Sequence, residues 1–195
     1  PLTQTRKQRK HAVHILAHLR AAAPVHVSAE QQIIRDHHVA EEFARFRRTL
    51  YYSAFGEGWA LYTQSLGGEL GLYTEPIQYF GHLGDEMHRA IRLVVDVGLH
   101  TKGWTREQAI QYMRANEPIS EQGAVAEIER YMAIPGQALS YKIGQLKIRE
   151  LRRRPEEVLG VKFQIGLFHD EILRYGNVPL GLLETRVDEW IEKMK

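Results

Sequence analysis

The sequence predicts an all-α protein of about eight helices joined by short connections. Three observations support this fold class. Apolar residues recur at three- and four-residue spacings along most of the chain. Capping residues and Gly or Pro breaks divide the chain into segments of helical length. No alternating apolar and polar pattern, as a half-buried strand would need, lasts beyond four residues.

Two helices are predicted before the central part of the chain. The first follows a basic run, Arg6–Lys10, and its apolar face is formed by Ala12, Ile15, Leu16 and Leu19. It ends before Pro24, which cannot continue a helix. The second begins at Ser28, a favourable N-cap residue, and runs to Phe43.

The stretch from Phe43 to Gly71 is predicted to be a buried helix. Its apolar residues near the helical period are Leu50, Ala54, Leu61 and Leu66. Gly56 and Gly58 flank Glu57 within this otherwise apolar run. The two glycines indicate a helix that is locally loosened or closely approached by another segment.

The remaining helices are bounded by caps and breaks. In chain order, the first follows the turn Tyr73–Pro76 and ends at residues 98–100, with Gly98 near its C-cap. The next two run from the capping box of Thr105 and Gln108 to Asn116, and from Ser120 to Tyr131. The last four run from Ala138 to Arg154, begin at Pro155, and cover Phe163–Tyr175 and Leu180–Met194. The helix before Gly98 has an apolar face formed by Leu83, Met87, Ala90, Ile91, Val94 and Val95. Its polar side carries Glu86, Arg89, Arg92 and Asp96.

Composition limits the classes of function. The chain has 195 residues, enough for one domain or part of a larger one. No apolar run approaches the roughly 20 residues of a membrane span, and no signal-like start is present. A net charge of +2 gives no reason to expect nucleic-acid binding. The absence of cysteine excludes thiolate chemistry and disulfides, whereas ten histidines make a metal worth considering.

Motif inspection leaves a metal or acid–base site built on helices as the route to catalysis, because no phosphate-binding loop or nucleophile elbow is present. His14 and His18 have the spacing of zinc ligands, but Ile15 stands where that motif needs Glu. One helical turn separates His37 from Glu41, and His38 from Glu41 or Glu42. These residues could share a cation or form ordinary pairs along the helix.

Glu57 is the central candidate. An ionised carboxylate on a buried helix is costly unless an arginine or a metal ion meets it. Its type and setting suit the third ligand of a helical zinc peptidase, and a structural ion pair is the alternative. Tyr141, after a rigid Pro-Gly turn, and His100, at a helix end, suit oxyanion stabilisation.

From Phe43 onward the chain resembles a large bacterial family called domain of unknown function 885, which looks like the helical gluzincin-type zinc peptidases. The segments that carry the resemblance include EGWALY, RLVVDVGLH, PGQALSYKIG and FHDEIL, within residues 54–76, 81–113, 127–152 and 159–184. The resemblance implies a mostly helical fold, like the C-terminal part of a zinc-peptidase fold, and metallopeptidase activity in a family that is often exported or lipid-anchored.

The same resemblance implies roles for individual residues. Glu57 matches the Glu of the Glu-Gly-Trp-Ala segment and is expected to be a metal ligand. Tyr141 and His100 match residues expected to line the cleft. In the family, a His-Glu…Pro-Gly-His-His segment upstream is expected to supply the histidine ligands and the general base. Residues 1–42 lack it, and their nearest counterpart is Asp36-His37-His38.

Residues 1–42 are therefore interpreted as a diverged or foreign helical segment, and 43–195 as the family-like domain. The first functional hypothesis is a zinc-dependent peptidase acting on short peptides. Its ligands would be Glu57 with His37 and His38, or with His14 and His18, and Glu41 or Glu42 would be the base. The alternative is a non-catalytic helical fragment that forms a homodimer or binds a partner through an exposed cleft. A third reading is an anionic-surface module using residues 6–20.

Overall fold

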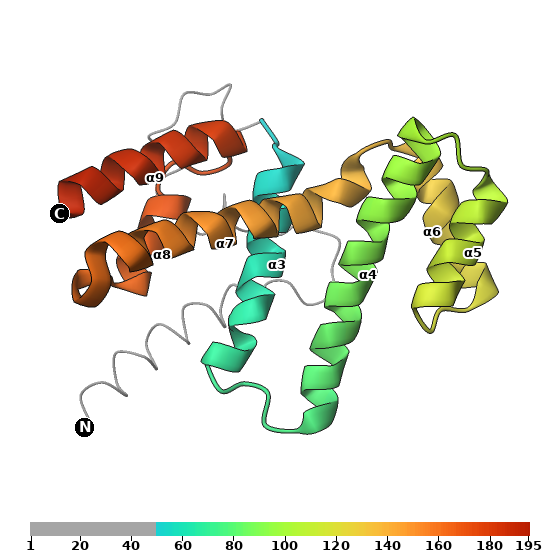
Figure 1. Ribbon diagram of the computed structural model, residues 1–195, viewed down its shortest axis with the longest axis horizontal. Coiled ribbons are helices and arrows are strands. Elements are labelled where there is room, and N and C mark those ends of the chain that lie inside the picture. The colour runs from blue at the N-terminus through green and yellow to red at the C-terminus, as the bar shows by residue number, and fades with distance from the viewer. Residues whose placement is uncertain (1–49) are drawn as a thin grey trace.

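The computed structural model describes residues 50–195, which form seven α-helices and two 3₁₀ helices without any β-strand (Figure 1). The prediction of an all-α fold is confirmed for this part of the chain. In order, the elements are α3 (Ser53–Glu69), α4 (Pro76–Thr101), α5 (Arg106–Asn116), α6 (Glu121–Ala133), η3 (Gln137–Leu139), α7 (Ser140–Leu159), η4 (Gly160–Lys162), α8 (Ile165–Leu173) and α9 (Leu180–Met194).

Two hydrophobic cores organise these helices. The first joins α3, α7, α8 and α9, and its fully buried members include Phe55, Tyr62, Ile148, Phe168 and Val187. The second joins the C-terminal half of α4 with α5, α6 and η3, and includes Ile91, Val95, Met113, Ile128 and Ala138. In Figure 1, α5 and α6 stand on one side of α4 and α3 stands on the other, while α7 crosses α3.

The crossing of α3 and α7 depends on two glycines. A Cβ atom on Gly58 would lie 2.4 Å from the Cα atom of Gly144, and one on Gly144 would lie 1.8 Å from the carbonyl oxygen of Ala54. Ser53 and Ser140 join the same crossing through hydroxyl groups 2.6 Å apart. The close approach that the sequence predicted at Gly58 is therefore confirmed, and its partner is another glycine.

The first core contains a buried polar pair. The hydroxyl of Tyr62 and the Nε2 atom of His169 lie 2.8 Å apart, and the ring of Trp59 meets that of His169 edge-on. Burial raises the pKa of Tyr62 to about 12, against the opposing charge of Arg152. Tyr62 therefore stays protonated at neutral pH and provides a hydrogen-bond partner for Nε2 of the buried imidazole.

Helix caps agree with the sequence. The Thr105 hydroxyl accepts a hydrogen bond from the Gln108 amide at 3.2 Å, and the Gln108 side chain accepts one from the Thr105 amide at 2.8 Å. Ser120 caps α6 by accepting from the Gly123 amide at 3.1 Å. These reciprocal bonds satisfy amides that the first helical turn leaves unpaired, which is why the two starts were readable from sequence.

One predicted C-cap and one predicted helix start are wrong. The C-cap of α4 is Lys102, one residue after its last residue Thr101, and Gly98 lies inside the helix, where a Cβ would meet the Trp104 ring at 2.5 Å. Gly103, with φ of 66°, makes the turn instead. Pro155 does not begin a new helix but lies buried within α7. Ion pairs of Arg152 with Glu156 (2.8 Å) and of Arg153 with Glu157 (2.7 Å) hold the helix together across the proline.

On helix α4, residues of the predicted polar side are buried and residues of the predicted apolar side are exposed. Arg92 and Asp96, on the polar side, are each only 2% exposed, whereas Leu83 and Met87, on the apolar side, are 47% and 52% exposed. The polar side faces η3 and α7, where it finds polar partners. No helix within residues 50–195 is long and apolar enough to cross a membrane.

Candidate functional site

Glu57 lies half-buried on α3, one residue before the glycine crossing. Its Oε1 atom accepts hydrogen bonds from the Tyr51 hydroxyl and from the Gln137 side-chain amide, both at 3.4 Å. Within residues 50–195 no arginine or lysine forms an ion pair with it. The structural ion pair that the sequence left open therefore finds no partner in the part of the chain described here.

Tyr141 faces Glu57 from the first turn of α7. Burial raises the pKa of Tyr141, and the negative charge of Glu57 raises it further. A tyrosine with a raised pKa keeps its proton at neutral pH. Tyr141 is consequently available as a hydrogen-bond donor beside the carboxylate.

Gln137 connects Glu57 to the buried arginine of α4. The Nη2 atom of Arg92 donates to Oε1 of Gln137 at 3.0 Å. An arginine can only donate, so this bond fixes the amide oxygen toward Arg92 and turns the amide nitrogen toward Glu57. The orientation of Gln137 is thus set by a residue that does not itself bond to Glu57.

Arg92 and Arg89 also hold the Tyr141 ring. The guanidinium carbon of each lies 4.6 Å from the ring centroid, and that of Arg92 lies 5.0 Å from the ring of Tyr131 as well. Cations at this distance from an aromatic face are attracted by its quadrupole. Stacking therefore limits the rotation of Tyr141 and offsets the cost of burying the Arg92 charge.

The turn before η3 is fixed by Asp96. Its carboxylate accepts from the Gly136 amide at 3.1 Å and 3.2 Å, and Gly136 has a φ of 80°, a conformation that favours glycine. The carboxylate is 2% exposed, so the bond is protected from water. This turn leads directly into Gln137 and then to Tyr141.

A second polar network lies beside the site, between α4 and α7. Lys142 forms an ion pair with Glu86 and donates to Oε1 of Gln145 at 2.9 Å. The Gln145 amide donates both to Glu86 and to the carbonyl of Leu61. Burial alone would raise the pKa of Glu86, but the hydrogen bonds from Lys142 and Gln145 outweigh it, so the pKa of this carboxyl is lowered.

The predicted site residues fall into three groups. Glu57 and Tyr141 are brought together. His100 is exposed near the end of α4, and its Nε2 atom lies 3.0 Å from the carbonyl oxygen of Tyr131. Within residues 50–195, no hydrogen bond or ion pair joins His100 to Glu57 or Tyr141. His37, His38 and Glu41 lie outside the described residues. The roles assigned to all six residues stay predictions.

The fit to zinc is partial. Glu57 is a suitable oxygen ligand, but within residues 50–195 no group of three His, Cys, Asp or Glu side chains could hold a metal ion. A structural zinc site takes four protein ligands and a catalytic one takes three. The described residues therefore do not complete a zinc site by themselves, and any further ligands must come from elsewhere.

Sequence reasoning missed Gln137 and the inward orientation of Arg92 and Asp96. The signal available was an Arg and an Asp one turn apart within the apolar run RLVVDVGLH. Charged residues within such an apolar run often face the protein, and here both face η3 and the turn before it. Periodicity alone did not show which side of the helix meets the protein.

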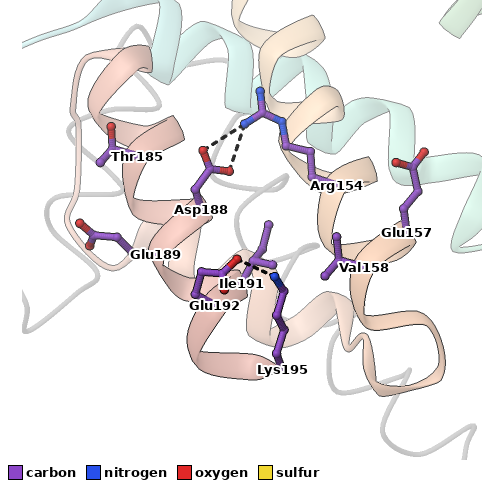
Figure 2. Close-up of a pocket in the computed structure, with 9 residues that line it drawn as sticks. All are labelled: Arg154, Glu157, Val158, Thr185, Asp188, Glu189, Ile191, Glu192 and Lys195. Atoms are coloured by element: carbon purple, nitrogen blue, oxygen red, sulfur yellow. Dashed lines mark hydrogen bonds and ion pairs between the residues drawn. The ribbon is translucent and has the colours of Figure 1, made fainter.

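A surface hollow of about 590 Å³ lies between the end of α7 and α9 (Figure 2). Charged side chains on its wall pair with one another, Arg154 with Asp188 at 3.1 Å and Lys195 with Glu192 at 2.6 Å. None of the six predicted site residues lines it. Its lining carries two cationic side chains and four carboxylates.

Comparison with known proteins identifies relatives. A sequence model described as "Bacterial protein of unknown function (DUF885)" matches residues 31–187. The chain is also similar to the crystal structure of a "putative lipoprotein" from Colwellia psychrerythraea, with 48% sequence identity and a TM-score of 0.79. That match covers 83% of this chain but only 28% of the other. No curated protein matches the sequence.

Proposed function

Because the chain belongs to the bacterial DUF885 family of unknown function, we propose that it forms one wall of a zinc-dependent peptidase site that hydrolyses short peptides. The observation that supports this most directly is the placement of Glu57. A half-buried carboxylate faces a protonated tyrosine and an oriented amide, all three on different elements that converge at one crossing.

Each residue has a distinct proposed role. Glu57 supplies one oxygen ligand, and Tyr141 donates a hydrogen bond to the oxyanion that develops on the scissile carbonyl. His37 and His38 supply further ligands and Glu41 the general base, from the segment before residue 50. His100 is proposed to line the cleft. When bound, the metal would supply polarisation of the peptide carbonyl.

The Colwellia relative also supports a proposal about location. Its description as a "putative lipoprotein" agrees with an exported or lipid-anchored protein, and we infer the same location for this protein. Because the chain spans 28% of that relative, the activity proposed here concerns the site rather than the whole relative.

The test is the zinc content of the purified, untagged chain, measured by elemental analysis beside Glu57→Ala. We expect about one zinc per chain in the wild type and none retained in the variant after dialysis, because losing one of so few ligands removes most of the affinity. Glu189→Ala removes an exposed carboxylate on α9 and should leave the zinc content unchanged.

Circular dichroism must show that both variants remain helical. A wild type without zinc, or a zinc content that Glu57→Ala does not lower, would contradict the proposal. If zinc is present, hydrolysis of a short peptide library by the wild type and not by Glu57→Ala completes the test.

A further inference from the structure

Helix α4 carries an apolar seam along its whole length. Its residues follow one another at alternating spacings of three and four, as in helices that pack side by side. They are Ile77, Phe80, Gly84, Met87, Ile91, Val94 and Gly98. All seven are uncharged. In the second half of the helix, α5 and α6 cover Ile91, which is 3% exposed, and Trp104 packs on Gly98.

The first half of the seam is uncovered. Ile77 is 72% exposed, Phe80 68% and Met87 52%, and Leu83 beside them is 47% exposed. In Figure 1, α5 and α6 flank the C-terminal half of α4. Four large apolar side chains on three turns form a patch of several hundred Å², roughly the size at which exposed apolar surface marks an interaction site.

A glycine on this half-helix points to close packing. Helical glycine costs stability relative to alanine, so it usually has a packing reason. Gly58, Gly67 and Gly98 each have one, since a Cβ there would lie 2.4–2.5 Å from a neighbouring atom. Gly84 has no atom within 4 Å of such a Cβ. It is an uncovered hole on the seam, one turn after Phe80.

We propose that the first half of α4 is a self-association surface that packs antiparallel against α4 of a second copy. A two-fold axis at residue 82 would place Phe80 opposite Gly84 of the second copy. The same axis pairs Ile77 with Met87. The Phe80 ring of each copy then meets the glycine of the other, which is the self-complementarity that a two-fold interface requires.

The flanking groups are compatible with this arrangement. Asp85 is paired within its own helix with Arg89 at 3.3 Å. His82 is turned toward the rings of Tyr73 and Tyr79, at centroid distances of 5.4 Å and 6.0 Å, and so lies off the seam. No like charges would face each other along the seam. With its polar flanks, the half-helix is of the scale of the roughly 800 Å² per partner that stable interfaces bury.

Cysteine cross-linking tests the pairing and its register, because the chain has no native cysteine. The double variant Ile77→Cys/Met87→Cys places its thiols about 15 Å apart on one helix, given 1.5 Å per residue. A disulfide needs Cα atoms within about 7 Å, so it can form only between copies. We expect a covalent dimer on mild oxidation of the full chain.

The single variant Ile77→Cys shows whether the two α4 helices pair parallel or antiparallel. In the antiparallel pair, two copies of Ile77→Cys are also about 15 Å apart and should not cross-link, whereas a parallel pair would link them. Val161→Cys, at a fully exposed position on η4, measures random collision. Cross-linking of the double variant no faster than Val161→Cys, or efficient linking of Ile77→Cys alone, would overturn the proposal.

Sedimentation of the unmodified chain gives an independent check. The wild type should be dimeric, and Phe80→Asp should raise the dimer dissociation constant at least about a hundredfold, because each of two buried rings is replaced by a charge. Val161→Asp should change nothing. A wild type that stays monomeric would refute self-association.

Discussion

Replacing Gly144 with alanine is expected to lower the free energy of unfolding by about 3 kcal/mol or more. The added Cβ would lie 1.8 Å from the carbonyl oxygen of Ala54 and 2.6 Å from the Cα atom of Gly58. Both neighbours are backbone, so no side chain can move aside. The helices must separate, and the core of α3, α7, α8 and α9 loses contacts as they do.

Chemical denaturation followed by circular dichroism measures this loss. Gly181→Ala is the matched control, since Gly181 is also helical but has no atom within 4 Å of an added Cβ. That variant should be as stable as the wild type or up to about 1 kcal/mol more stable, because alanine is the better helix former. Equal stability of the two variants would show that the crossing is not tightly packed.

Replacing Lys142 with methionine is expected to cost about 3 kcal/mol. The side chains of Lys142 and Glu86 are 15% and 16% exposed, and the pair is completed by Gln145. Methionine has nearly the shape of lysine but leaves the Glu86 carboxylate buried without its cation. Lys193→Met, on an exposed part of α9, should change the free energy of unfolding by less than about 0.5 kcal/mol.

The pH dependence provides a second signature. The pKa of Glu86 is lowered in the folded chain, so its contribution to stability is present above the usual carboxyl pKa and is lost as the pH falls through the folded pKa. The stability difference between wild type and Lys142→Met should therefore narrow below about pH 4. A difference that stays constant with pH would assign the loss to packing rather than to charge.

The helix boundaries and helix faces show what the sequence could and could not reveal. Helix starts at Thr105 and Ser120 were readable because capping is local. The continuation of α7 through Pro155 was not, since it depends on ion pairs and burial on both sides of the proline. For α4 the sequence separated the two faces correctly, but in the C-terminal half of the helix both faces meet the rest of the protein.

The site was predicted in part for similar reasons. Glu57 stood out because a carboxylate between two glycines in an apolar helix needs a partner. Its neighbour Tyr141 is 84 residues away in numbering (141 − 57), and only the helix crossing brings the two together. Gln137 went unnoticed because its importance comes from Arg92, which fixes the amide from a third helix.

The presence of two separate cores has a consequence for the motions of the molecule. One core holds α3, α7, α8 and α9, and the other holds the end of α4 with α5 and α6. Regions with separate cores can open independently, each with its own free energy. The α5–α6 pair can therefore unfold locally and expose its amides to hydrogen exchange, while the glycine crossing beside Glu57 opens only when the larger core does.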